Sequence, residues 1–77
     1  MQEVTNKIYI SNMKPGSDEN SLRKIFIKYG DIININHRGS YAFVEFIEIE
    51  AVMYAIKDMA DKSEMRVQKA YAKQPQN

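Results

Sequence analysis

Hydrophobic and polar residues change their period several times along this chain of 77 residues, and each change indicates a new element. Residues 7–11 (KIYIS) alternate between polar and apolar side chains and include residues that favour β structure. We therefore predict a first strand with Ile8 and Ile10 turned toward a core. Tyr9 then points to the opposite face, because successive side chains of a strand alternate.

A helical period follows the turn-forming segment 12–16 (NMKPG). Ser17 stands before an acidic first turn, in the position expected of a helix N-cap. Gly30 stands where a left-handed C-terminal cap is usual. Between them the apolar residues recur at helical spacing, at Leu22, Ile25, Phe26 and Tyr29. The pattern predicts a first helix that buries one stripe of its surface.

Period two returns over residues 31–38 (DIININHR), which indicates a second strand. Its alternation places Ile33, Ile35 and His37 on one side and Asn34, Asn36 and Arg38 on the other. Residues 41–46 (YAFVEF) alternate in the same way. Only Gly39 and Ser40 separate the two runs, so we predict an antiparallel hairpin with a tight turn.

Helical period comes back from about residue 48 to residue 59, with one apolar stripe at Val52, Ala55, Ile56 and Met59. After the polar connection 60–64, residues 65–73 (MRVQKAYAK) have enough Val, Tyr and alternation for a last strand. The register of this strand is ambiguous, because Val67 has the opposite parity to Ala70 and Ala72. A β-bulge is one arrangement that would reconcile them.

The predicted order is β-α-β-β-α-β, the ferredoxin-like split βαβ arrangement of the α+β class. In it a four-stranded antiparallel sheet carries both helices on one face, and its other face is open. The residues that turn toward the helices are Ile8, Ile10, Ile33, Ile35, Ala42, Val44 and Phe46. Tyr9, Tyr41 and Phe43 must then share the open face. One domain takes up residues 1–73, and residues 74–77 (QPQN) are interpreted as a polar tail or the start of a linker.

Composition narrows the classes of protein to which the chain could belong. A formal charge of +1 gives no strong global field for a polyanion, although the C-terminal part is locally basic. The absence of cysteine fits a reducing intracellular compartment, and one histidine without cysteine suggests neither a metal site nor a cofactor. No apolar run approaches the roughly 20 residues that cross a bilayer, and the N-terminus lacks the apolar centre of a signal peptide. We therefore expect no membrane association.

Three aromatic rings on one open face imply a binding partner. Burying an aromatic ring is favourable by about 1.5 to 3 kcal/mol, so a cluster left in water suggests a ligand that covers it. Flat rings on a sheet can stack with unpaired bases at about 1 to 3 kcal/mol each, whereas double-helical RNA does not offer its bases in this way. We therefore expect Tyr9, Tyr41 and Phe43 to bind single-stranded RNA. The alternative is that the rings pack against each other or beneath a C-terminal extension.

Polar and basic side chains near these rings complete the predicted RNA-binding site. Asn34 and Asn36 could hydrogen-bond base edges, and Ser11 could donate to a sugar or phosphate; plain solvent exposure is the alternative for each. The basic residues that could meet phosphate or a base plane are Lys7, Arg38, Arg66, Lys69 and Lys73. His37 has the parity of Ile35, so we expect it to be a partly buried edge residue with a local hydrogen bond.

Two segments of the chain resemble the signature motifs of the RNA-recognition motif family. Residues 8–13 (IYISNM) resemble the hexamer on the first strand of that family, and residues 41–46 match the second half of its octamer on the third strand. Residues 21–32 (SLRKIFIKYGDI) and 55–59 (AIKDM) are also similar to its helix segments. The resemblance covers nearly the whole chain, and it implies the fold that the periodicity predicts.

The resemblance also implies roles for particular residues. Tyr9, Tyr41 and Phe43 take the positions of the aromatics that stack on bases or contact sugars. The family's octamer usually begins with a basic residue and a glycine directly before the first aromatic; here Gly39 and Ser40 fill those places, and Arg38 stands one residue earlier. The very short link between the second and third strands resembles the splicing-factor type of the family. By that analogy we expect a role in pre-mRNA splicing or mRNA processing in the nucleus, with shuttling to the cytoplasm left open.

Three classes of function compete. The leading hypothesis is a noncatalytic, monomeric module that binds single-stranded RNA and works with other domains of a longer chain or with ribonucleoprotein partners. The second is a protein-interaction domain of the same fold, in which the aromatic sheet or a helix face docks a peptide; the near-neutral charge favours it. The third is an enzyme that hydrolyses acyl phosphates. The segment NMKPG is not a phosphate-cradling glycine-rich loop, and no nucleophile stands with an evident base, so we expect no catalysis.

Overall fold

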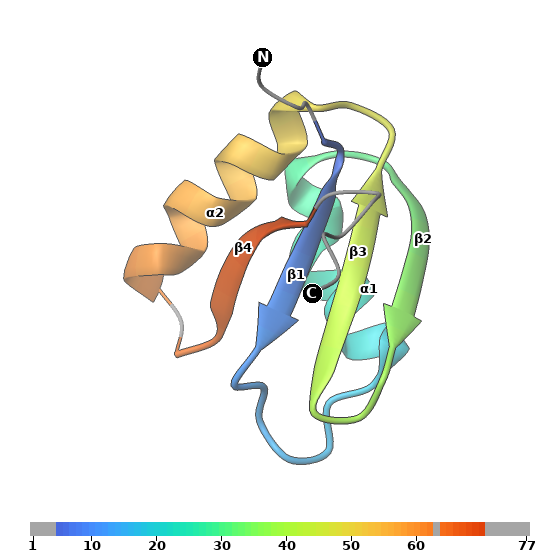
Figure 1. Cartoon of the computed structure of the whole chain (residues 1–77), viewed down its shortest axis with the longest axis vertical. Coiled ribbons are helices and arrows are strands. Elements are labelled where there is room, and N and C mark those ends of the chain that lie inside the picture. Colours follow the sequence, from blue (N-terminus) through green and yellow to red (C-terminus); the bar gives the residue numbers. More distant parts are fainter. Residues whose placement is uncertain (1–4, 63, 71–77) are drawn as a thin grey trace, which may run out of the picture.

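The part of the chain that a computed structural model describes forms four strands and two α-helices in the predicted order (Figure 1). The elements are β1 (Lys7–Ser11), α1 (Glu19–Phe26), β2 (Ile32–His37), β3 (Tyr41–Phe46), α2 (Glu50–Lys62) and β4 (Arg66–Ala70), and a short 3-10 turn, Ile27–Tyr29, extends α1. The structure describes residues 5–62 and 64–70. The predicted tail 74–77 and the candidate site residue Lys73 therefore lie outside the described residues.

The strands form one antiparallel sheet in the order β2-β3-β1-β4. Strand β1 pairs with β3 on one side and with β4 on the other, and β2 pairs with β3. The predicted hairpin between β2 and β3 is confirmed: the backbone N–H of Arg38 donates to the carbonyl of Tyr41 at 2.8 Å. Gly39 adopts φ +93° in this turn, a conformation that glycine reaches without steric cost.

Both helices cover the same face of the sheet, so the predicted fold class is confirmed. Figure 1 shows the strands lying in front of α1. The core residues are Ile8, Ile10, Ile35, Ala42, Val44 and Phe46 from the strands, Leu22 and Phe26 from α1, and Ala51, Val52, Ala55 and Met59 from α2. Because all the strand residues in this core have the same orientation, the alternate residues of β1 and β3 lie on the face that the helices leave open.

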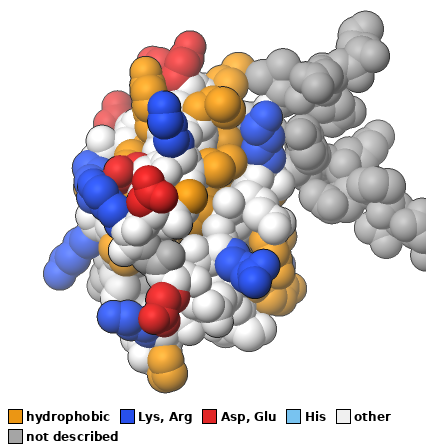
Figure 2. Space-filling model, turned by 90° about the vertical axis from the view of Figure 1, so that its left-hand side faces the viewer, with side chains coloured by type: hydrophobic (Ala, Val, Ile, Leu, Met, Phe, Trp, Pro, Cys, Tyr) orange, Lys and Arg blue, Asp and Glu red, His pale blue; other side chains and the backbone are white. Residues whose placement is uncertain are grey.

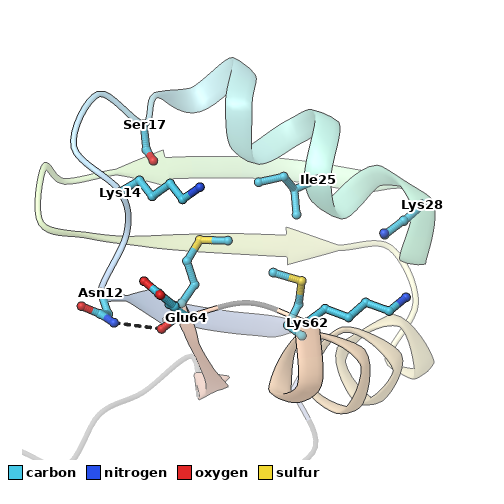
Figure 3. Close-up of a pocket in the computed structure, with 9 residues that line it drawn as sticks. Asn12, Lys14, Ser17, Ile25, Lys28, Lys62 and Glu64 are labelled. Carbon is cyan, nitrogen blue, oxygen red and sulfur yellow. Dashed lines mark hydrogen bonds between the residues drawn. The ribbon is translucent and has the colours of Figure 1, made fainter.

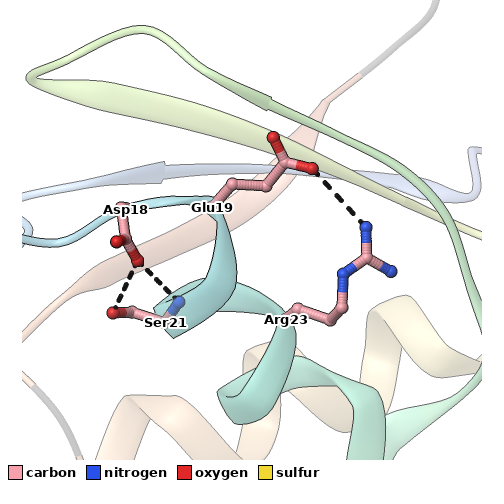
Figure 4. A network of polar contacts seen from close by, with 4 residues as sticks. All are labelled: Asp18, Glu19, Ser21 and Arg23. Carbon is pink, nitrogen blue, oxygen red and sulfur yellow. Dashed lines mark hydrogen bonds and ion pairs between the residues drawn. The ribbon is translucent and has the colours of Figure 1, made fainter.

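The first helix begins one residue later than the sequence suggests, and the predicted N-cap Ser17 is wrong. Asp18 is the cap: its Oδ1 accepts hydrogen bonds of 2.9 Å from both the backbone N–H and the hydroxyl of Ser21 (Figure 4). These bonds, with the backbone donor first, lower the pKa of Asp18 below its usual value. Ser17 belongs to the preceding turn instead, since its backbone N–H donates to the carbonyl of Lys14 at 3.1 Å. An ion pair between Arg23 and Glu19, 3.6 Å long, lies on the same helix (Figure 4).

Gly30 does not adopt the left-handed conformation predicted for it. Its φ of 165° and ψ of 167° are extended, so backbone strain does not explain the glycine. Packing does: a Cβ atom at Gly30 would lie 2.8 Å from the Cβ of Ala51, in the first turn of α2. The glycine lets the chain after α1 pass directly beside the second helix.

The prediction that Ile33 turns inward is also wrong. Ile32 is paired with Phe46 and Asn34 with Glu45, so Ile33 is an extra residue in a β-bulge. Ile32 packs against the core in its place, and Ile33 is 55% exposed. The bulge restores the predicted alternation from Asn34 onward.

Strand β4 pairs in a regular register across Arg66–Ala70, so no bulge lies between Val67 and Ala70; Ala72 lies outside the described residues. Val67 lies opposite Ile10 and packs against the core. Ala70 lies opposite Lys7, on the other side of the sheet, and is nevertheless 2% exposed. The two residues are thus covered on opposite faces.

Several large apolar side chains remain exposed around the start of α2. Figure 2 looks at the side of the molecule on which α2 lies, and hydrophobic side chains there are interspersed with charged ones. The exposed residues of this region are Ile47, Ile49, Met53 and Tyr54, at 48% to 60% exposure. Tyr54 is therefore a solvent-facing aromatic residue that does not belong to the sheet.

Candidate nucleic-acid interface

Tyr9, Tyr41 and Phe43 form a cluster of rings on the open face, which we call the aromatic cluster. The antiparallel register places Tyr9 opposite Phe43 and Ser11 opposite Tyr41. The ring centroid of Tyr9 lies 5.4 Å from that of Phe43 and 5.7 Å from that of Tyr41, and Tyr41 and Phe43 are 5.8 Å apart. The predicted grouping of the three rings on one face is confirmed.

The rings pack against each other and still keep accessible surface. The ring plane of Tyr9 is tilted by 37° from that of Tyr41 and by 53° from that of Phe43, and Tyr41 and Phe43 meet edge to face at 87°. Tyr41 is 36% exposed, and Tyr9 and Phe43 are half-buried. The alternative that the rings pack together therefore holds in part. Its other form, cover by a C-terminal extension, falls on residues outside those described.

A hollow lies beside the aromatic cluster, toward β4. Its lining is Tyr9, Phe43, Gln68, Lys69 and Ala70, and its volume is about 380 Å³. Pockets for small ligands begin at about 300 Å³. The hollow thus offers a flat group next to Tyr9 both aromatic contact and the amide of Gln68, which can donate and accept.

The two asparagines of β2 lie where the sequence predicts. Asn36 is paired with Phe43 and Asn34 with Glu45, and both side chains are exposed on the open face. Glu45 is a residue of this face that sequence reasoning did not name, although its parity with Phe43 could have shown it. Lys7 lies opposite Glu45 on β1. The carboxylate offsets the charge of Lys7 and makes this end of the face less attractive to phosphate.

Strand β4 changes which of its side chains belong to the site. Arg66 is paired with Ser11 and Gln68 with Tyr9, so both have the orientation of the open face. Lys69 is paired with the buried Ile8, so it has the orientation of the helix-covered face. Because β4 is an edge strand, Lys69 is nevertheless exposed, and it also lines the hollow. Sequence reasoning missed Gln68. Val67 is apolar and favours the buried side of the strand, so its neighbour Gln68 is expected to face the open side. That pattern could have identified Gln68.

Arg38 and His37 lie at the hairpin end of the sheet, where His37 is paired with the buried Ala42 and so has the orientation of the helix-covered side. Arg38 is exposed beside the turn, one residue beyond β2. His37 is half-buried, and its Nδ1 accepts a hydrogen bond of 3.2 Å from the backbone N–H of Gly39, which confirms the predicted local bond. Its Nε2 is buried and finds no partner among the described residues. His37 thus supports the turn, and Arg38 and Arg66 are exposed cations near this end of the face.

Two other kinds of feature are absent from residues 5–62 and 64–70. This part of the chain contains no group of three or more acidic or histidine side chains arranged to hold a metal ion. Neither of its helices is long and apolar enough to span a membrane.

Known proteins resemble the chain in both sequence and fold. The family described as RNA recognition motif matches residues 8–66. The solved RRM of Nab3, from a study of cis element recognition in non-polyadenylated RNAs, has 20% identity and a TM-score of 0.81, over 88% of this chain and 97% of that one. The RRM of RNA15 has 15% identity and a TM-score of 0.83, over 91% and 94%. At these identities the two structures establish the fold alone.

A third solved structure holds RNA recognition domains 1 and 2 of Sex-lethal from Drosophila melanogaster. It has 25% identity and a TM-score of 0.75, and the match covers 84% of this chain and 46% of that one. The family match begins at Ile8, the second residue of β1, includes both helices and the β2–β3 hairpin, and ends at Arg66, the first residue of β4. The motif that carries the aromatic cluster lies wholly within it.

Proposed function

The chain belongs to the RNA recognition motif family, and on that basis we propose that it binds single-stranded RNA through the open face of its sheet. The observation that carries the proposal is the aromatic cluster: three rings from β1 and β3 share one face, within 6 Å of each other, and retain accessible surface. Unpaired bases stack on such rings, and paired bases are not available to them. The role is binding, without catalysis.

In this proposal, the residues around the aromatic cluster have different roles in binding RNA. Tyr41 offers the most accessible ring at the hairpin end, and the hollow beside Tyr9 receives a second base next to Gln68. Asn34 and Asn36 lie on the flank formed by β2, where their amides can hydrogen-bond base edges. Ser11, between Tyr41 and Arg66, can donate to a sugar or phosphate.

Few of the described cations serve the backbone of the RNA. Among residues 5–62 and 64–70, the basic residues of the open face and its turn are Lys7, Arg38 and Arg66, with Lys69 at the edge, and Glu45 offsets one of these charges. Each phosphate contact with a single strand contributes about −0.7 to the slope of log K against log salt. Three net contacts give a slope of about −2, so binding depends mainly on stacking and hydrogen bonds.

Amide chemical-shift mapping tests the proposal directly. A pool of short single-stranded RNA oligomers is titrated into ¹⁵N-labelled protein at about 0.1 M salt, with a blunt RNA duplex as the control. The single strands should shift the amides of Tyr9, Tyr41, Phe43 and Gln68, and the duplex should not. The proposal fails if neither RNA shifts them, or if a peptide pool shifts them and RNA does not.

We further propose that the RNA is a pre-mRNA or mRNA and that the protein acts in the nucleus, with other domains or ribonucleoprotein partners. The support is the short link between β2 and β3, the three residues 38–40, which resembles the splicing-factor type of the family. Crosslinking in cells identifies the bound transcripts, and fluorescence microscopy locates the protein. Recovery of intron-containing transcripts from nuclei is expected; recovery of transfer or ribosomal RNA alone would reject this part of the proposal.

A further inference from the structure

A second hollow lies away from the aromatic cluster, between the two helices and the loops that precede α1 and β4 (Figure 3). Its volume is about 310 Å³. The lining residues are Asn12, Lys14, Ser17, Ile25, Lys28, Met59, Lys62, Glu64 and Met65. The aromatic cluster contributes none of them, so the two sites are separate.

A tight turn before α1 forms one wall of this hollow. Residues 14–17 (KPGS) have proline in the second position and glycine at φ +89° in the third, and the N–H of Ser17 donates to the carbonyl of Lys14 at 3.1 Å. This is the sequence and bonding of a type II turn. Figure 3 shows the turn side by side with α1 and the side chain of Lys14 extended across the space between them.

A hydrogen bond closes the same end of the hollow, below this turn in Figure 3. Asn12 follows β1 in a left-handed conformation with φ 58°, and its side-chain amide donates to the carbonyl of Glu64 at 2.9 Å (Figure 3). Asparagine tolerates this conformation better than most residues. The bond ties the segment before β4 to the end of β1, so the hollow has walls that the fold itself fixes.

The lining combines an apolar floor with a basic rim. Ile25 of α1 and Met59 of α2 are the apolar residues from the helices, and Met65 adds a second thioether. Thioether side chains adapt to apolar groups of varied shape. Of the lysines, Lys62 is paired with Asp58 at 3.0 Å, whereas Lys14 and Lys28 make no ion pair with any residue that the structure describes.

We propose that this hollow is a docking site for an acidic peptide segment that inserts one apolar anchor side chain. Its volume lies at the lower end of ligand pockets, about 300 Å³, which suits a single anchor. The charges are complementary: the amines of Lys14 and Lys28 attract flanking carboxylates, and they are offset only in part by Glu64 of the lining and by Asp58, which pairs with Lys62 and also interacts with Lys28. The partner is thus a protein, held on one site while RNA occupies the other.

An RNA strand fits this hollow less well than a peptide does. The lysines can pair with phosphate, but a phosphate group does not cover the apolar surface of Ile25 and Met59. The lining also contains no aromatic ring on which a base could stack. An apolar side chain of the size of leucine covers Ile25 and Met59 and removes their apolar surface from water.

The test uses two peptides that differ only in the anchor. Acetylated and amidated DEDLDE is titrated into ¹⁵N-labelled protein at about 0.1 M salt, and DEDSDE replaces leucine by serine. DEDLDE should shift the amides of Ser17, Ile25, Lys28 and Glu64 and leave those of Tyr9 and Phe43 in place. DEDSDE should bind at least fivefold more weakly.

Matched charge reversals locate the site. The double substitution Lys14→Glu with Lys28→Glu should weaken DEDLDE at least tenfold. Its control, Lys24→Glu with Lys57→Glu, makes the same change in charge at exposed positions outside the lining, one of them on each helix, and should change affinity less than twofold. Equal losses in the two variants, shifts confined to the sheet face, or shifts at the hollow from hexauridine but not from DEDLDE would each overturn the proposal.

Discussion

The rings of Tyr9 and Phe43 lie 5.4 Å apart, centroid to centroid, across the β1–β3 pair, and their planes are tilted by 53°. Such tilted pairs are worth about 0.5 to 1.5 kcal/mol beyond the area they bury, so each ring holds the other in place. Because the planes differ, one flat base cannot stack on both rings. Successive bases must leave their own stack to use the two rings, which selects for single strands.

Replacing two rings should remove most of the RNA affinity. Tyr41→Ala with Phe43→Ala is expected to weaken a short single-stranded RNA more than tenfold, a loss of about 1.4 kcal/mol or more, because two stacking surfaces are lost. Both residues lie outside the buried core, so the circular dichroism spectrum should stay unchanged.

Tyr54→Ala is the control for this variant. Tyr54 is 60% exposed on α2, so its loss also removes an accessible ring. Fluorescence anisotropy with a labelled oligomer measures all three proteins. Affinity within twofold of the original in the double variant, or an equal loss in Tyr54→Ala, would contradict stacking on the sheet.

Arg66 should contribute through charge. It has the orientation of the open face, opposite Ser11. Arg66→Ala is expected to weaken RNA a few-fold and to make the slope of log K against log salt shallower by about 0.7, because one phosphate contact is lost. Lys24→Ala removes the same charge from the exposed surface of α1 and should leave the slope unchanged. A slope that is identical in Arg66→Ala and the original protein would show that Arg66 meets no phosphate.

Alternation along a strand is a local property, and the sequence predicted it well. The runs around Tyr9 and Phe43 place both rings on one face whichever strands they pair with, so the central part of the site could be found without coordinates. Ile33 shows the limit of this reasoning. Its bulge depends on how Ile32 and Asn34 pair with another strand, which period two cannot reveal.

Other differences have the same physical origin. Gly30 is required by the close approach of Ala51, a residue of another element, and not by its own backbone. Gln68 belongs to the site because strand pairing determines which side chains of β4 lie on the open face. The mixed pattern of apolar residues in β4 did not determine this. Ser17 is a different case, because Ser17 and Asp18 are adjacent residues that can both cap a helix, and it is Asp18 that accepts from Ser21. The outcomes at Gly30 and Gln68 depend on a contact between segments.

Gly30→Ala should destabilise the fold through this contact. The added methyl group meets Ala51 at 2.8 Å, and overpacking of a closed interior costs about 1 to 3 kcal/mol. Urea denaturation measures the free energy of unfolding. Ala51→Gly removes the opposing Cβ, so the double variant should lose less stability than the two single losses combined. Strict additivity would mean that the two residues do not touch.

The cap assignment predicts that Asp18 and Ser17 differ in importance. Asp18→Ala should lower the melting temperature by a few degrees, because Ser21 loses its acceptor, and Ser17→Ala should change it little. The pKa of Asp18 is lowered in the folded state, chiefly by the Ser21 backbone N–H. Its contribution is therefore present above the usual carboxylate pKa and is lost as the pH falls through the lowered value. Thermal unfolding of both variants at several pH values decides between the two caps.

The bond between Tyr29 and Asp58 should give the fold an alkaline limit. The Tyr29 hydroxyl donates to Asp58 Oδ2 at 2.6 Å, which joins the end of the first helical segment to α2. Burial first, and then this hydrogen bond, raise the pKa of Tyr29 from 10.0 to about 12. Between these values the unfolded chain loses the phenol proton while the folded chain keeps it, so ionisation favours unfolding. The stability that neutral Tyr29 provides is therefore complete below pH 10 and is lost as the pH rises toward 12.

Tyr29→Phe keeps the ring and removes the titrating group, so it isolates this effect. Below pH 10 the variant should melt a few degrees lower than the original protein, because Asp58 loses a donor. The pKa of Asp58 is lowered by the Tyr29 hydroxyl first and then by Lys62, so this difference should also fade in strong acid, as Asp58 takes up a proton. Melting curves of the two proteins should differ on a plateau and converge on both sides of it. A difference that stays constant from neutral pH to pH 12 would show that the bond does not form in solution.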